Sequence, residues 1–254
     1  GKYLFGKHGN PPEGELSKLG EVGQFHIKRR RTKNLIHFDI KPDNILISPR
    51  GEALLSDFGL AKKTALCGLA EADEFYFKMC PPEAFSKHEF STHFDIYQSG
   101  LTLYRMCVGD IVFYDQYYSY FSNGSFDRDI FKVDVRNSIF PDRDVLPIHI
   151  PQKLKATIKK CLHSDINHRF SSAIDVINEL AGIEGNILDW ECEYSDTDIC
   201  YTKNVDDKKY ELIVTNDKKS TATKQVNGGK KRTIPDYCLG NINNRSVYKF
   251  LVSH

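Results

Sequence analysis

The stretch LIHFDIKPDNILIS, residues 35–48, decides how the rest of the chain is interpreted. Its apolar ends, LIHF and NILIS, predict two short buried strands. Between them, the polar side chains of Asp39, Lys41 and Asn44 are close enough in sequence to converge on one point. A carboxylate can accept a hydroxyl proton, an amide oxygen can coordinate a hard cation, and an ammonium group can neutralise phosphate charge. The stretch therefore suggests a phosphoryl-transfer site on a loop between buried strands.

A second carboxylate follows another predicted strand. The sequence EALLSDFGL predicts a strand that leads into a loop at Asp57, and the turn residues in SPRGE predict a hairpin between this strand and NILIS. Asp57 could therefore supply a second oxygen ligand to Mg²⁺.

Composition limits the class of protein. The 254 residues are 40% hydrophobic and 27% charged, which is typical of a soluble globular chain with one large or two modest domains. The net charge of +1 gives no reason to expect nucleic-acid binding, and no apolar run is long enough for a membrane span. Seven cysteines without a C-x-x-C pair predict reduced thiols and a cytoplasmic location.

Helical patterns dominate the first two thirds of the chain. Residues 13–34 are helix-compatible and end in the basic run KRRRTK, and residues 94–110 have helical apolar spacing that Gly109 should stop. Two further amphipathic helices are predicted within 151–165 and 171–183, the second with a serine N-cap.

The pattern changes near residue 183. The segments WECEYS, ICYTK, YELIVTN, TKQVNGGKKRT and VYKFLVSH are rich in β-branched and aromatic residues or alternate in polarity, and Asn227-Gly228 is a hairpin-turn signal. We predict an α+β protein in which a mostly helical domain, residues 1–182, precedes a β-rich C-terminal extension, residues 183–254, with one buried face.

Five motifs in order resemble the eukaryotic-type protein kinase superfamily. HFDIKPDN and SDFG resemble the catalytic and magnesium loops, and CPPE at 80–83 resembles the Ala-Pro-Glu motif. DIYQSG at 95–100 resembles the start of the large C-lobe helix, and CLHSDINHRF at 161–170 resembles the late motif that contains an arginine. The resemblance covers residues 1–182 and implies the C-lobe of a kinase.

The resemblance implies roles for the polar residues. Asp39 would be the catalytic base that orients the acceptor hydroxyl, and Lys41 would contact the γ-phosphate of ATP. Asn44 and Asp57 would hold Mg²⁺, or Mn²⁺ in its place. A lysine two residues after the catalytic aspartate is the Ser/Thr-type pattern, so the implied partner is a protein substrate with a serine or threonine hydroxyl.

Structural roles are implied for His37, Phe58, Gly59, Glu83, Asp95 and Arg169. Glu83 and Arg169 would form a buried ion pair, and Asp95 would hydrogen-bond the backbone of the catalytic loop. His37 and Phe58 would pack and orient the loop.

Two positions depart from the family pattern. Phe38 replaces the arginine that usually grips a phosphorylated activation loop, so we expect that phosphorylation of this loop is not the main switch. Tyr76 stands where the family places a threonine that braces the catalytic residues. Either this brace differs or the substrate site is unusual.

No N-lobe signature is present, since only 36 residues precede His37 and neither a G-x-G-x-x-G loop nor a Val-Ala-x-Lys strand occurs. The native protein could carry an N-lobe outside this sequence, the β-rich tail could replace it by permutation, or the chain could be a binding module without one. We expect this chain by itself to turn over poorly.

Two other functions stay open. A pseudokinase or scaffold is one alternative, but it need not keep all four of the residues retained here, Asp39, Lys41, Asn44 and Asp57. A small-molecule kinase of the aminoglycoside or choline type would have a related fold, but CPPE and Arg169 favour the protein kinases. The β-rich tail could bind a partner or brace the C-lobe.

Overall fold

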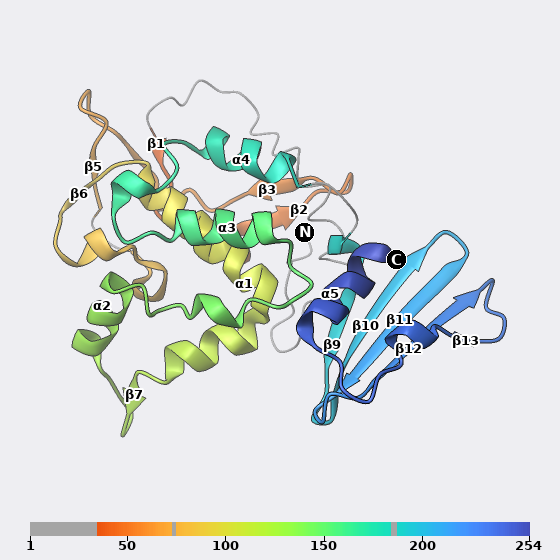
Figure 1. Ribbon diagram of the computed structural model, residues 1–254. Coiled ribbons are helices and arrows are strands. Elements are labelled where there is room, and N and C mark those ends of the chain that lie inside the picture. Colours follow the sequence, from red (N-terminus) through yellow and green to blue (C-terminus); the bar gives the residue numbers. More distant parts are fainter. Residues whose placement is uncertain (1–34, 73–74, 184–186) are drawn as a thin grey trace. The chain divides into compact units, whose positions relative to one another are not determined.

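The computed structural model describes residues 35–72, 75–183 and 187–254 (Figure 1). The helix predicted for residues 13–34, with its basic run, lies outside the described residues. The described chain forms two compact units, the first made of residues 35–147 and 152–183 and the second of residues 148–151 and 187–254. Helices and strands are mixed, and a five-stranded sheet lies in the C-terminal part, which agrees with an α+β class.

The first unit contains short antiparallel strand pairs. β2 (Ile45–Ile47) pairs with β3 (Ala53–Leu55), which confirms the predicted hairpin, and Gly51 takes a positive φ of 83° in its turn. The other pairs are β1 (Leu35–Ile36) with β4 (Lys62–Lys63), β5 (Ala70–Glu71) with β6 (Glu89–Phe90), and β7 (Phe121–Ser122) with β8 (Ser125–Phe126).

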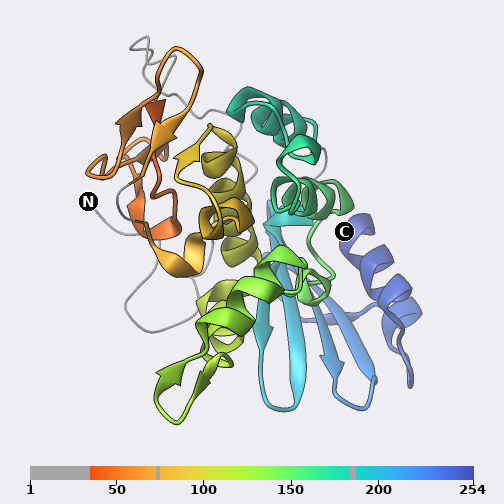
Figure 2. The same cartoon turned by 90° about the vertical axis from the view of Figure 1, so that its left-hand side faces the viewer.

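The long helix α1 (His93–Tyr118) crosses the middle of this unit (Figures 1 and 2). Its first half is buried on most sides. Gly109 interrupts it with φ 80° and ψ 160°, as predicted, but helical residues resume after the break and continue to Tyr118. At Gly100 an added Cβ would lie 2.6 Å from Cβ of Cys161, so only glycine allows the close approach of the two segments.

Three shorter helices and several 3₁₀ turns complete the first unit. The helices are α2 (Arg128–Arg136), α3 (Gln152–Cys161) and α4 (Ala173–Ala181). The side chain of Ser172 accepts a hydrogen bond from Asp175 N, which confirms the predicted cap of α4. The 3₁₀ turns are Pro42–Asn44, Phe77–Met79, Pro82–Phe85, Arg143–Val145 and Ile166–His168. No described helix is both long enough and apolar enough to cross a bilayer.

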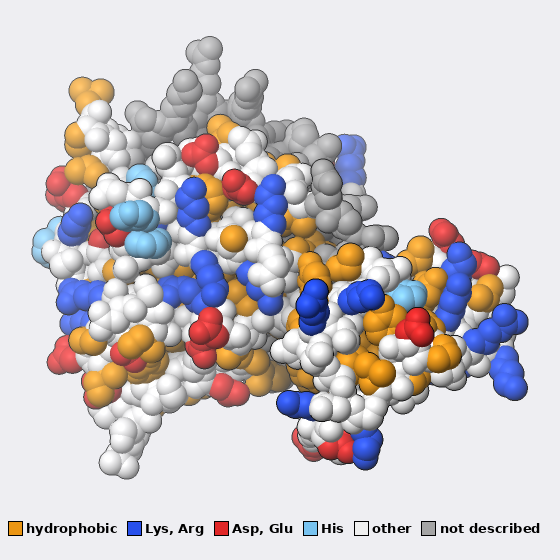
Figure 3. Space-filling model, viewed as in Figure 1, with side chains coloured by type: hydrophobic (Ala, Val, Ile, Leu, Met, Phe, Trp, Pro, Cys, Tyr) orange, Lys and Arg blue, Asp and Glu red, His pale blue; other side chains and the backbone are white. Residues whose placement is uncertain are grey.

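The outer face of α3 is basic. Its sequence QKLKATIKKC alternates lysines with the buried residues Leu154, Ile158 and Cys161. Figure 3 shows Lys and Arg side chains over this helix. The lysines are therefore a solvated face of an amphipathic helix, opposite the stripe that packs inward.

A buried ion pair ties the segment after β5 to the unit. The guanidinium of Arg169 donates hydrogen bonds of 2.8 and 2.7 Å to the two carboxylate oxygens of Glu83, and the Arg169 side chain is 0% exposed. Its remaining N–H groups donate to the carbonyl oxygens of His93 (3.0 Å) and His163 (2.7 Å). This bidentate pair is the one that the sequence predicted.

The second unit is a meander of five antiparallel strands with the order β13-β12-β11-β10-β9. The strands are β9 (Glu191–Tyr194), β10 (Asp198–Val205), β11 (Lys208–Thr215), β12 (Ser220–Val226) and β13 (Arg232–Thr233). Tyr201, Leu212 and Ala222 are paired across three strands and are all buried on one face. Asn227 and Gly228 both have positive φ, so the predicted turn is present. The 3₁₀ turns of this unit are Ile187–Asp189 and Pro235–Tyr237.

The predicted last strand, VYKFLVSH, is wrong. This segment lies in α5 (Asn244–Ser253), which runs across one face of the sheet (Figures 1 and 2). Val247, Phe250 and Leu251 have helical spacing and contribute to the core against the sheet. Asn243 caps the helix by accepting a hydrogen bond from Ser246 N. The cap and the period of the apolar residues outweigh the β-propensity of the valines and aromatics.

We expect Glu83→Gln to lower the free energy of unfolding by about 3–5 kcal/mol, because the Arg169 guanidinium would keep its burial and lose its counter-charge. Chemical denaturation of the purified protein measures this change. Asp144→Asn is the control, since it breaks the exposed pair between Asp144 and Lys159 and should cost less than about 1 kcal/mol. Equal losses in both variants would contradict a special role for the buried pair.

Candidate active site

The loop between β1 and β2, residues 37–44, bends sharply at Phe38. This residue has a φ of 64°, a left-handed conformation that costs a non-glycine residue about 1–2 kcal/mol. The Asp95 carboxylate on α1 accepts hydrogen bonds from the backbone N–H groups of His37 (2.8 Å) and Phe38 (3.0 Å). The hydrogen bonds that the sequence analysis expected of Asp95 are thus present, and they fix the bend.

Two more polar side chains of α1 hold the same loop. The amide of Gln98 accepts a hydrogen bond from Ile40 N and donates one to Phe38 O, both at 2.9 Å. The hydroxyl of Thr102 donates to Gln98 O at 2.8 Å and lies 3.4 Å from Ile40 O. Asp95, Gln98 and Thr102 lie on one face of the helix because they are three and four residues apart. One helix face therefore sets the backbone of the loop.

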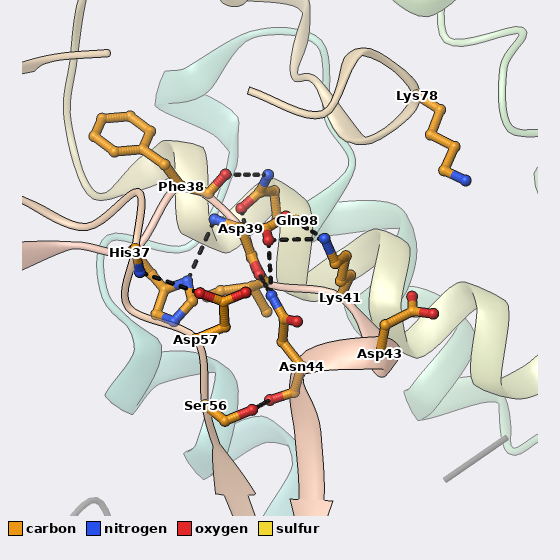
Figure 4. Close-up of polar contacts among 12 residues, drawn as sticks. His37, Phe38, Asp39, Lys41, Asp43, Asn44, Ser56, Asp57, Lys78 and Gln98 are labelled. Carbon is orange, nitrogen blue, oxygen red and sulfur yellow. Dashed lines mark hydrogen bonds and ion pairs between the residues drawn. The ribbon is translucent and has the colours of Figure 1, made fainter. Parts of the chain in front are cut away.

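The Asp39 carboxylate lies at the centre of the polar contacts in the loop (Figure 4). Lys41 Nζ donates to both of its oxygens, at 2.9 and 2.7 Å, and Asn44 Nδ2 donates to Oδ2 at 2.8 Å. Asp39 is only 5% exposed, so its carboxylate is largely removed from water. The three hydrogen bonds to this charged group restrict its movement. The structure brings Asp39, Lys41 and Asn44 together, as the sequence spacing suggested.

The orientation of the Asn44 amide is fixed by its partners. Its nitrogen donates to Asp39 O and to Asp39 Oδ2, each at 2.8 Å, and both partners are acceptors only. The amide oxygen must therefore point away from Asp39. Ser56 supports Asn44 from the neighbouring strand, because its N–H and its hydroxyl both donate to Asn44 O at 2.8 Å.

Asp57, Phe58 and Gly59 follow β3. Asp57 is exposed and has a φ of 58°, and its Oδ1 accepts a hydrogen bond from Gly59 N at 3.2 Å. A Cβ at position 59 would lie 3.1 Å from that oxygen, so glycine leaves room for the carboxylate. The Phe58 ring is 54% exposed and makes an edge contact with the His37 ring, with centroids 4.7 Å apart.

The His37 ring is buried, and desolvation lowers its pKa below the usual value. The neighbouring carboxylate of Asp39 opposes this change without overcoming it. His37 Nδ1 accepts a hydrogen bond from Asp39 N at 3.3 Å, which requires an unprotonated Nδ1. Burial and hydrogen bonding thus favour the same neutral tautomer, and the ring serves to shape the loop.

Phe38 lies in an aromatic cluster. Its ring contacts Phe94 (centroids 4.9 Å apart) and Phe90 (5.9 Å), and Phe75 contacts both of those rings at 5.8 and 6.0 Å. Ile36 and Ala70 complete this buried cluster. The position that carries arginine in the family pattern therefore joins the loop to the 57–83 segment by apolar contacts.

The comparison with protein families agrees with this geometry. The protein kinase domain family matches residues 27–180, which is more than half of the chain. This chain belongs to the protein kinase family. The match includes the 37–44 loop, the 57–83 segment, α1 and Arg169.

Curated relatives carry kinase names. A probable serine/threonine-protein kinase of Dictyostelium discoideum is 32% identical over 137 residues, which cover 53% of this chain and 8% of that protein. Mitogen-activated protein kinase kinase 1 of Arabidopsis thaliana is 34% identical over 112 residues, covering 42% of this chain and 30% of that protein. The Aurora kinase of Dictyostelium discoideum is 29% identical over 157 residues, covering 58% and 34%. The chain thus spans about a third or less of each of these relatives.

Sequence reasoning missed several residues that build the site. Gln98 and Ser56 hold the loop, and Thr102 lies beside it. Tyr76, which the sequence already marked as a departure from the family pattern, places its ring 4.2 Å from Lys41 Nζ. The helix residues had a detectable signal, since Asp95, Gln98 and Thr102 form a polar stripe on an otherwise apolar helix. Ser56 had no such signal, because its partner is distant in sequence.

Asp95 should titrate near neutral pH. Burial raises its pKa from the ordinary 3.8 to about 6, although the two backbone N–H groups that it accepts oppose the shift. The native carboxyl binds its proton more tightly than the unfolded one. Its contribution to stability is therefore full below about pH 4 and is lost as the pH rises through about 6, a change of up to about 3 kcal/mol.

Carbon-13 NMR of the carboxyl groups tests this directly, and we expect a midpoint near 6 for Asp95. In parallel, the free energy of unfolding should fall less between pH 4 and pH 7 in Asp95→Asn than in wild type. Asp129→Asn, which changes an exposed carboxylate, is the control and should leave the pH dependence unaltered. A midpoint below the ordinary 3.8 would show that the two N–H groups outweigh burial.

Proposed function

We propose that the protein transfers the γ-phosphate of ATP to a serine or threonine hydroxyl of a protein substrate. The observation that carries the proposal is the Asp39 carboxylate, which is nearly buried and bonded by Lys41 and Asn44 on a loop that α1 holds rigid. Such preorganised charge suits a reaction in which positioning and electrostatics supply most of the rate. The serine/threonine-kinase name of the first Dictyostelium discoideum relative supports the choice of acceptor.

In this mechanism, Asp39 orients the acceptor hydroxyl and accepts its proton. The hydrogen bonds from Lys41 and Asn44 hold the carboxylate in place before the substrate arrives. Lys41 also neutralises charge on the transferred phosphoryl group, since its ammonium lies beside the carboxylate that binds the attacking hydroxyl. Asp39 thus acts on the hydroxyl oxygen and Lys41 on the phosphoryl group, which are the two partners of the new oxygen–phosphorus bond.

Asn44 and Asp57 would hold the divalent cation, Mg²⁺ or Mn²⁺. The fit rests on two observations: Asn44 turns its amide oxygen away from Asp39, and Asp57 is an exposed carboxylate after β3. One amide and one carboxylate suit Mg²⁺, which commonly takes few protein ligands and fills its octahedron with water and phosphate oxygens. When bound, the cation neutralises charge on the phosphate groups of ATP.

We expect Asp39→Asn to lower phosphate transfer from γ-labelled ATP by about 100- to 10,000-fold, the usual contribution of a general base. The assay uses the full-length protein and a serine- and threonine-containing protein acceptor. Asp43→Asn is the matched control, because it removes the same charge from an exposed position in the same loop. That variant should retain activity within about threefold.

The outcomes separate the alternatives. Transfer that survives in Asp39→Asn would contradict the proposal. Wild-type protein that binds the metal and ATP but transfers nothing would favour a scaffold, and transfer only to an amino alcohol or sugar would favour a small-molecule kinase.

We propose further that phosphorylation of the 57–83 segment is not the main switch. Phe38 offers an apolar ring where a phosphate would need a guanidinium, and its cluster already includes Phe75 of the segment. Between Gly59 and Pro81 the sequence has only one serine or threonine, Thr64. The Thr64 hydroxyl is buried, with no hydrogen-bond partner among the described residues.

Thr64→Val should therefore keep its transfer rate within about twofold of wild type, because no phosphate is needed at that position. Mass spectrometry of the active protein should find Thr64 unmodified. Phe38→Leu keeps an apolar group and should be tolerated, whereas Phe38→Ala should lower stability by about 3–5 kcal/mol. A large loss of activity in Thr64→Val, with phosphate on Thr64 of the wild type, would contradict this idea.

A further inference from the structure

We propose that Tyr76 is a positioning residue that holds the Lys41 ammonium against Asp39 through the face of its aromatic ring. This inference rests on the proposed function, in which Lys41 and Asp39 act together on the phosphoryl group and the acceptor hydroxyl. In the kinases that this chain resembles, a threonine at this position braces the catalytic residues. The ring of Tyr76 would take over that role here.

The ammonium of Lys41 is held from two directions. Its Nζ lies 2.7 Å from Asp39 Oδ2 and 2.9 Å from Oδ1, and it lies 4.2 Å from the centroid of the Tyr76 ring. The Lys41 side chain is only 15% exposed. A cation is attracted to the face of an aromatic ring, and the attraction is stronger when the cation is desolvated. The ring therefore disfavours rotamers that would carry Lys41 away from Asp39.

The Tyr76 ring itself is placed by its neighbours in sequence. Phe75 packs against Phe90 and Phe94, and Phe77 packs against Phe85 and Phe131, with centroids 5.3 and 5.4 Å from its ring. Two anchored aromatic residues thus fix the backbone on either side of position 76. Tyr76 O also accepts a hydrogen bond from Met79 N at 2.8 Å. Its ring can therefore stay over Lys41 at little further cost in conformational entropy.

The contact uses the ring and not the hydroxyl. Tyr76 is 48% exposed, and its hydroxyl has no hydrogen bond within the described part of the chain. A second ammonium, that of Lys78, lies 5.0 Å from the same ring, but it donates a hydrogen bond of 2.8 Å to the hydroxyl of Tyr114. Lys78 is thus directed to Tyr114, and Lys41 is the cation that the ring places beside Asp39.

The first test is kinetic and uses the full-length protein. Tyr76→Leu should lower kcat about 5- to 30-fold, the fold-change equivalent to a cation–π contact, with little change in KM for ATP. Tyr76→Phe keeps the ring and should retain the wild-type kcat within about twofold. Tyr118→Leu is the control: Tyr118 is 58% exposed, and no cation lies over its ring among the described residues.

A double-mutant comparison tests whether Tyr76 acts through Lys41. In a Lys41→Met background, Tyr76→Leu should change the residual rate by less than about twofold, because the group that the ring positions is gone. An equal loss in both backgrounds would show that Tyr76 acts elsewhere and would overturn the inference.

The second test needs no turnover. A proton over an aromatic face is shielded, so NMR of the lysine ε-methylene groups should show an upfield Lys41 signal, assigned by its loss in Lys41→Met. Tyr76→Leu should remove the upfield shift, and Tyr76→Phe should keep it.

The outcomes distinguish this inference from the proposed function. If wild type transfers no phosphate to protein, the proposed function fails, and the Lys41 signal alone decides whether the ring holds the ammonium. If wild type is active but Tyr76→Leu keeps both the full kcat and the Lys41 shift, the proposed function stands and the positioning role is overturned.

Discussion

The candidate site depends on the hydrogen bonds between the Asp95 carboxylate and the backbone N–H groups of His37 and Phe38. A left-handed phenylalanine costs about 1–2 kcal/mol, whereas each hydrogen bond to a charged acceptor contributes about 1.5–3 kcal/mol. The two bonds are therefore sufficient to maintain the bend. Gln98 adds one donor and one acceptor to the same stretch of backbone. Because the bend turns Asp39 toward Lys41 and Asn44, the geometry of these three residues follows from polar groups on α1 that lie outside the loop.

The polar residues of the site could be predicted from the sequence more fully than the residues that hold them in place. Asp39 and its partners in the loop could be predicted because they belong to one short motif, whereas the buried pair of Glu83 with Arg169 was implied only by the resemblance to the kinases. Gln98 lies 60 residues from the Phe38 carbonyl that it contacts, and single-sequence patterns carry no information on such pairs. The last helix, residues 244–253, was mistaken for a strand because β-branched and aromatic residues weighed more than the helical period. The α+β composition, by contrast, follows from local patterns and was predicted correctly.

Both departures from the kinase pattern replace a polar group with an aromatic ring. Phe38 takes the place of an arginine and packs with Phe90 and Phe94, and Tyr76 takes the place of a threonine and lies over Lys41. The two positions belong to the loop and to the 57–83 segment, so each substitution joins these elements by ring contacts. Dispersion and burial are screened little by salt and need no added phosphate. These ring contacts thus indicate that the position of the 57–83 segment is set when the chain folds.

The contacts along the 57–83 segment are graded in strength. Its end is fixed by the bidentate pair of Glu83 with the fully buried Arg169, and Phe75 near its middle lies in an aromatic cluster. At its start, Phe58 is half-exposed, and among the described residues its ring contacts that of His37 alone. Deforming the end would separate buried charges, whereas moving the start loses one partly solvated contact. The end of the segment at Glu83 is therefore the rigid one, and Asp57 at its start has more freedom to move.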